Sequence, residues 1–249
     1  MQIELTAATA AEAEGTFDWD IYLLAGVGSS RTIFAECMKE LQRRYAESGF
    51  FPRIRELFPY GDHTRNFYMQ LLKVRRDISR LPKSAQSGAK TVAKQIRKLS
   101  SGRPVLFIGH SGGGVAAYQA AVMLSRGGII PDWRVIQIGS PKLPIHGQHA
   151  DKVHFVVSVD EKGDCTDFVT SLGSWGGFSL SRRGLPFWNR SKYAPKHIIP
   201  VPMIGGHKHY FRKEDPFVHP ERGSNLGMIT DTIWERIARE LCMGASRFL

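Results

Sequence analysis

Apolar residues along the chain occur as short continuous runs that alternate with stretches of helical spacing. Continuous runs predict buried strands over 21–27, 105–109, 133–139 and 153–159, and two weaker runs predict strands within 50–61 and 197–206. The segments between them predict helices over 31–48, 64–81, 88–100, 113–126 and 226–243. Alternating strands and helices favour an α/β fold, a three-layer sandwich whose mostly parallel sheet has helices on both faces. The last strand is interrupted by prolines, so we expect it near an edge of the sheet.

The length of 249 residues suits a single α/β domain spanning 1–249. One stretch, about 171–196, departs from the regular pattern because it is rich in Gly, Ser, Arg and aromatic residues. It predicts an irregular, lid-like insertion. Its large apolar residues would either line a wall for an acyl group or pack against the core: Trp175, Phe178, Leu185, Phe187 and Trp188.

Charge changes this picture more than overall composition does. The hydrophobic content of 42% and charged content of 23% are typical of soluble globular proteins, but the net charge is +11. Basic residues concentrate in 73–80, 94–103 and 181–196. Such a surface attracts nucleic acid, anionic lipid or acidic substrates. Because no RNA-binding signature or zinc-finger spacing accompanies the charge, we expect a solvated basic face with weak association to anionic surfaces and no specific nucleic-acid partner.

Cysteine spacing and hydropathy indicate the compartment. Cys37, Cys165 and Cys242 are widely separated and have no metal-type spacing, which favours free thiols in a reducing environment. No apolar run approaches the roughly 18 residues of a membrane span, and the N-terminus lacks the pattern of a secretory signal. These features predict a cytoplasmic protein without a transmembrane segment. His146 and His149 could form a metal pair, but the absence of a nearby third ligand argues against one.

The candidate chemistry lies at Ser111. Gly109-His110-Ser111-Gly112-Gly113 fits G-x-S-x-G between a predicted strand and a predicted helix. On a sharp turn of this kind the glycines remove side chains that would collide, and the helix N-terminus supplies N–H groups that can stabilise an oxyanion. A plain glycine-rich turn is the alternative. A phosphate-binding loop is disfavoured because no lysine precedes Ser111.

This stretch resembles the nucleophile elbow of the α/β-hydrolase superfamily, and its G-H-S-x-G form is similar to that of class 3 (fungal lipase-like) serine esterases and lipases. The resemblance implies a catalytic triad in the chain order serine, acid, histidine. Enzymes of this class often carry a histidine just before a Tyr-Phe pair. In GGHKHYF (205–211), His207 fits that register and His209 is the alternative.

The acid would lie in DEKGDCTDFVTSLGSW (160–175). Position at the end of a strand favours Asp160, whereas DFVTSL resembles the family's signature around its catalytic carboxylate and favours Asp167. Asp167 is the preferred candidate, followed by Asp160 and then Asp164. The oxyanion would bind to the backbone N–H of Gly112 and to a second N–H after the first strand, for which Val27 fits best and Gly28 is next.

Only about 20 residues precede the first clear strand, so the N-terminal strands of the superfamily are expected to be reduced or absent. Lys208 and His209 also depart from the small or acidic residues expected before Tyr-Phe. The resulting hypothesis is a serine esterase or lipase that cleaves small-molecule or lipid esters and needs no metal or organic cofactor. A catalytically silent scaffold that binds an anionic partner is the alternative from another class. An acyltransferase or thioesterase that uses the same triad is a third.

Overall fold

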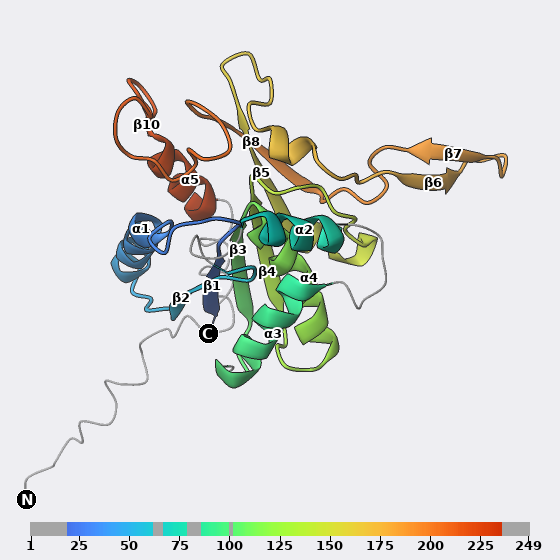
Figure 1. The fold of residues 1–249 in the computed structure, drawn as a ribbon, viewed down its shortest axis with the longest axis horizontal. Coiled ribbons are helices and arrows are strands. Elements are labelled where there is room, and N and C mark those ends of the chain that lie inside the picture. Colours follow the sequence, from blue (N-terminus) through green and yellow to red (C-terminus); the bar gives the residue numbers. More distant parts are fainter. Residues whose placement is uncertain (1–18, 62–66, 79–85, 100–101, 236–249) are drawn as a thin grey trace, which may run out of the picture.

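Six parallel strands form the central sheet of the computed structural model, which describes residues 19–61, 67–78, 86–99 and 102–235 (Figure 1). The strands are β1 (Asp20–Leu24), β2 (Ile54–Leu57), β3 (Val105–His110), β4 (Trp133–Ile138), β5 (Val153–Val159) and β8 (His197–Pro202). Their order is β2-β1-β3-β4-β5-β8, and every neighbouring pair is parallel. The predicted α/β fold is confirmed, and the proline-containing β8 is an edge strand as expected.

Helices cover both faces of this sheet. Side chains alternate along β1, so Ile21 and Leu23 join one buried cluster while Tyr22 and Leu24 join another. The first cluster contains residues of α1 (Ala35–Glu47) and α5 (Asn225–Ile233). The second contains residues of α3 (Ser87–Leu99) and α4 (Gly112–Arg126), with Val74 of α2 (Phe67–Ile78). Two cores on opposite faces of one sheet make the three-layer sandwich that the sequence predicts.

Several sequence predictions extend beyond the described residues. The helix expected over 64–81 is seen as α2, while 62–66 and 79–85 lie outside the described residues. The helix expected over 226–243 is seen as α5, and 236–249 lie outside them as well. The reduction of the N-terminal strands concerns residues 1–18, which are also not described. No helix among the described residues is long and apolar enough to cross a membrane.

The insertion at 171–196 is more regular than its composition predicts. It contains an antiparallel hairpin of β6 (Gly177–Leu180) and β7 (Pro186–Asn189), which extends sideways from the body of the molecule in Figure 1. A second, smaller hairpin of β9 (Val218–His219) and β10 (Gly223–Ser224) precedes α5. The lid role of the 171–196 segment stays a prediction.

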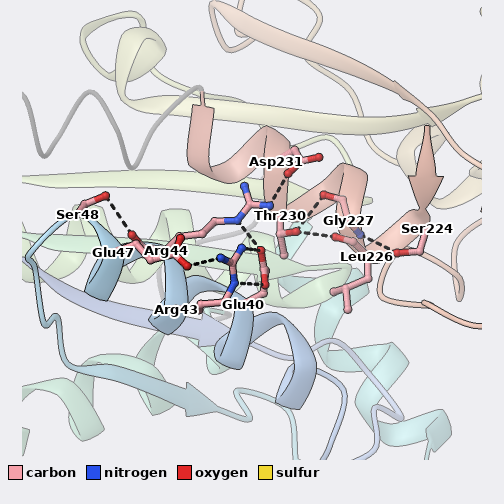
Figure 2. A network of polar contacts seen from close by, with 10 residues as sticks. All are labelled: Glu40, Arg43, Arg44, Glu47, Ser48, Ser224, Leu226, Gly227, Thr230 and Asp231. Atoms are coloured by element: carbon pink, nitrogen blue, oxygen red, sulfur yellow. Dashed lines mark hydrogen bonds and ion pairs between the residues drawn. The ribbon is translucent and has the colours of Figure 1, made fainter. Parts of the chain in front are cut away.

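Arg44 joins the two helices that cover one face of the sheet. Its Nε donates to Glu40 one turn earlier in α1 (2.6 Å), and its Nη2 donates to Asp231 of α5 (2.5 Å) (Figure 2). Ser224 caps the start of α5 by accepting from the Gly227 N–H at 3.1 Å. The Arg44 side chain is only 17% exposed. Its loss would remove a largely buried cation from the carboxylates of Glu40 and Asp231.

Replacing Arg44 by alanine is therefore expected to lower the free energy of unfolding by about 1–2 kcal/mol. Arg43 is the matched control because its ion pairs to Glu40 and Glu47 lie within α1 and on the surface. Arg43→Ala should have a much smaller effect, because exposed ion pairs contribute little to stability. Urea denaturation of both variants measures the difference, and equal losses would show that the contact between helices adds nothing.

Candidate active site

The direction of the strand order reverses between β1 and β3, which are neighbours in the sheet. After β1 the chain crosses to β2 on one side, whereas after β3 it crosses to β4 on the other. Open α/β sheets commonly bind ligands beside the carboxyl ends of the two strands at such a reversal. Ser111 directly follows β3, and Gly26 and Val27 follow β1, so the predicted nucleophile and the predicted oxyanion loop lie at the same edge of the sheet, after these two strands.

Ser111 occupies a strained turn between β3 and α4. Its φ of 56° and ψ of −131° make it the one non-glycine residue with positive φ among those that the structure describes. The Ser111 N–H donates to the carbonyl of Ile138 (2.9 Å), and the Ser111 carbonyl accepts from the Ser140 hydroxyl (2.8 Å) and the Gly114 N–H (3.0 Å). These bonds to β4 and α4 hold the unfavourable conformation in place.

Glycines around Ser111 allow unusually close backbone contacts. A Cβ on Gly109 would lie 2.5 Å from Gly114 Cα, and one on Gly113 would lie 2.0 Å from the Leu24 carbonyl oxygen. Both positions of the motif therefore require glycine, as predicted. Gly26 is equally constrained, since a Cβ there would lie 2.6 Å from Ser111 Cβ. The loop after β1 therefore packs directly against the serine.

The structure brings Ser111, His207 and Asp167 into one hydrogen-bonded chain. His207 Nε2 lies 2.9 Å from Ser111 Oγ, and His207 Nδ1 lies 2.9 Å from Asp167 Oδ2. Asp167 is fully buried, while His207 remains partly exposed. Three residues separated by up to 96 positions in sequence thus converge at the carboxyl edge of the sheet.

The alternative acid Asp160 and the alternative histidine have other contacts, and the third acid, Asp164, is exposed. Asp160 Oδ1 accepts from the backbone N–H groups of Lys162 and Asp164, both at 2.9 Å, so this carboxylate stabilises a turn. His209 Nδ1 accepts from the Gly206 N–H at 3.1 Å, and its ring stacks on Phe217. Among the described residues, neither Asp160 nor His209 joins the chain that contains Ser111.

Two further donors surround the Asp167 carboxylate. The Val169 N–H donates to Oδ1 and the Tyr210 hydroxyl donates to Oδ2, each at 2.9 Å. The Tyr210 oxygen also accepts from the Ser158 N–H at 3.0 Å. Burial, together with the negative charge of Asp167, raises the pKa of Tyr210 far above its ordinary value, so this hydroxyl stays protonated. In the sequence, Tyr210 is recognisable only as part of the Tyr-Phe pair that places the histidine, and nothing local predicts its contact with Asp167.

His110, the residue before the serine, packs against His207. The two rings are stacked with centroids 5.0 Å apart, and His110 Nε2 lies 3.2 Å from the His207 carbonyl oxygen. Burial and the neighbouring His207 lower the pKa of His110 to about 3, so its ring is neutral near pH 7. It can support the His207 loop without placing a second positive charge beside it.

Two backbone N–H groups are available near the serine. Gly112 is the first residue of α4, and the first N–H groups of a helix have no acceptor within the helix. The structure gives the Val27 N–H no hydrogen bond to any described residue. Gly112 directly follows Ser111, and Val27 directly follows Gly26, which packs against Ser111.

No protein-family model matches the chain, and neither does any curated protein. Among solved structures, it is similar to RedJ, a thioesterase from the prodiginine biosynthetic pathway of Streptomyces coelicolor, with 19% identity and a TM-score of 0.33. That match covers 52% of this chain and 43% of RedJ, so less than half of RedJ is represented. The lin2722 gene product of Listeria innocua is similar over 88% of this chain and 95% of its own, with 13% identity and a TM-score of 0.49. Likenesses this distant carry no argument about activity.

Proposed function

We propose that the protein is a serine hydrolase that cleaves carboxylic esters through an acyl-enzyme. Ser111 is the nucleophile, His207 the general base and Asp167 the residue that orients the histidine. The observation that supports this most directly is the continuous hydrogen-bonded chain from Ser111 Oγ through both ring nitrogens of His207 to Asp167, with 2.9 Å at each step. A Ser-His hydrogen bond oriented by a third group is the arrangement that activates a serine hydroxyl.

The first half of the reaction forms the acyl-enzyme. Because a carboxylate only accepts hydrogen bonds, the His207 proton lies on Nδ1, and Nε2 is left to accept the proton of Ser111. As Oγ attacks the ester carbonyl, the N–H groups of Gly112 and Val27 stabilise the oxyanion of the tetrahedral intermediate. His207 then gives the proton to the leaving alcohol, and the C–O bond of the ester breaks.

The second half regenerates the enzyme. His207 Nε2 takes a proton from water, whose oxygen attacks the acyl carbonyl, and the acid leaves as Ser111 recovers its proton. Through both halves Asp167 stabilises the transient imidazolium, and the donors Val169 and Tyr210 keep its carboxylate in place. Phe168 beside His207 offers apolar contact to the acyl group, since it is exposed and its ring centroid lies 6.5 Å from that of His207.

Turnover of p-nitrophenyl esters of different acyl length tests this function. We expect hydrolysis by the wild type and a loss of about 10⁴-fold or more in kcat for Ser111→Ala. Ser125→Ala, near the other end of α4, is the matched control and should keep full activity. A wild type that turns over thioesters but no oxygen esters would move the proposal to a thioesterase, and one inactive on both would favour a silent scaffold.

Tyr210→Phe should lower kcat by about three- to tenfold and leave KM nearly unchanged. The substitution removes the donor to Asp167 Oδ2 and the acceptor of the Ser158 N–H, while the ring keeps its packing. We also expect a decrease of about 1 kcal/mol in the free energy of unfolding. Steady-state kinetics with urea denaturation separates the two effects. Loss of stability with unchanged kcat would assign Tyr210 a structural role only.

A further inference from the structure

One face of the β6–β7 hairpin consists entirely of exposed apolar side chains. The register pairs Phe178 with Trp188 and Leu180 with Pro186, so these four residues point to the same side of the two-stranded sheet. Phe178 is 68% exposed, Leu180 72% and Trp188 48%. The Phe178 and Trp188 rings meet edge to face with centroids 5.2 Å apart, which arranges them as one apolar surface.

Apolar residues also occupy the other side and the tip of the hairpin. Phe187 projects from the opposite face and Leu185 follows the tip turn, and both are exposed. A protein partner that adds to one face would leave Phe187 in water. A lipid interface, by contrast, would surround an inserted hairpin and accommodate apolar side chains on both of its faces and at its tip.

The charged side chains of the segment that contains the hairpin are all basic. Residues 171–196 contain no Asp or Glu and five Lys or Arg. Arg182 and Arg183 form the tip turn, which is closed by the Gly184 N–H donating to the Ser181 carbonyl at 2.9 Å. Arg190 follows β7, and these three exposed arginines have no ion pair with any described residue. Exposed aromatic residues flanked by unpaired arginines match the chemistry of an anionic lipid headgroup layer.

The base of the hairpin is fixed to the body of the protein. Trp175 is buried against Phe155 with ring centroids 4.9 Å apart, and its carbonyl accepts from the Tyr193 N–H at 2.8 Å. The Tyr193 carbonyl in turn accepts from the Ile145 N–H at 2.9 Å. Figure 1 shows the two strands extending outward from this base. The β6–β7 hairpin is therefore fixed at its base while its apolar side chains face solvent.

We propose that the β6–β7 hairpin is a membrane anchor that inserts its apolar side chains into the interface of an anionic lipid bilayer, with Arg182, Arg183 and Arg190 at the lipid phosphates. This role goes beyond ester hydrolysis and does not depend on it. Binding should therefore be measured with Ser111→Ala, in which any hydrolysis of the lipid is removed.

Co-sedimentation with vesicles of phosphatidylcholine and phosphatidylserine (3:1) is the test, with vesicles of phosphatidylcholine alone for comparison. We expect binding to the anionic vesicles that weakens as salt is raised. Arg182→Gln with Arg183→Gln should weaken it by about 30-fold, because each basic residue near such a surface contributes about fivefold. Phe178→Ser with Trp188→Ser should weaken it by about tenfold or more.

Matched controls change the same residue types elsewhere. Arg97→Gln with Lys98→Gln removes two exposed charges at the end of α3, and Phe51→Ser removes an exposed phenylalanine before β2. Both should keep wild-type binding. Quenching of tryptophan fluorescence by lipids brominated in the acyl chains provides a second measurement that needs no disruptive variant. Bound protein should be quenched, and Trp188→Phe should remove most of that quenching.

Three results would overturn the proposal. The first is absence of binding to the anionic vesicles. The second is an equal effect of the hairpin variants and their controls, which would assign binding to the general basic charge. The third is equally tight binding to duplex DNA that does not change in Phe178→Ser with Trp188→Ser, which would make the hairpin a polyanion-binding arm. An inactive wild type in the ester assay would leave the anchor standing, so the two proposals fail separately.

Discussion

Replacing His207 by alanine is expected to lower kcat for ester hydrolysis by about 10⁴- to 10⁶-fold. The reason is that His207 Nε2, 2.9 Å from Ser111 Oγ, is the group positioned to take the serine proton. Without it the hydroxyl is a weak nucleophile at neutral pH, while substrate binding through the oxyanion loops and apolar contacts is retained. KM should therefore change by only a few-fold. Steady-state kinetics on a p-nitrophenyl ester measures both values.

His209→Ala is the matched control for that experiment. Its ring accepts from the Gly206 N–H and stacks on Phe217, so the substitution should reduce stability by about 1 kcal/mol. Its kcat should remain within about threefold of wild type. If His209→Ala were the inactive variant and His207→Ala the active one, the assignment of the base would be wrong.

Asp167→Asn is expected to lower kcat by about 10⁴-fold. The carboxylate accepts from His207 Nδ1 and thereby keeps the proton off Nε2, whereas an amide can donate to Nδ1 and stabilise the wrong tautomer. The side chain is fully buried and similar in size to asparagine, so the fold should be retained. Circular dichroism checks the fold, and single-turnover kinetics measures the loss of the acylation step.

The same substitution at the rival positions separates the three candidate acids. Asp160 binds the backbone of its own turn, so Asp160→Asn should affect local stability and leave kcat within about threefold. Asp164→Asn should behave similarly because that residue is exposed. Full activity of Asp167→Asn beside an inactive Asp160→Asn would transfer the role to the residue at the end of the strand.

Much of the fold was predictable because its signals are local. Continuous apolar runs mark the buried parallel strands, and the face of α1 that buries Cys37, Leu41 and Tyr45 follows the helical period. The turn at Ser111 was also predictable, since only glycine can lie where Gly109 and Gly113 approach other backbone atoms. The 171–196 segment was not, because its hairpin register depends on pairing between strands and not on the composition of either strand.

The site could be predicted only to a set of alternatives. Position in the sequence allowed three carboxylates and two histidines, and their separation depends on contacts made across the fold. Ser140 and Tyr210 were missed for the same reason, since neither the bond from Ser140 to the Ser111 carbonyl nor that from Tyr210 to Asp167 has a local sequence signal. Gly26 is a third example, because its constraint comes from Ser111, which follows a different strand.

Covalent labelling is the most direct test of whether Ser111 is an activated nucleophile. A fluorophosphonate reacts with an activated serine hydroxyl and stays attached, so mass spectrometry can count and locate the adduct without knowledge of the natural substrate. We predict one adduct per chain, on the peptide that contains Ser111, and none in Ser111→Ala. Absence of an adduct in the wild type, or an adduct that persists in Ser111→Ala, would contradict the account.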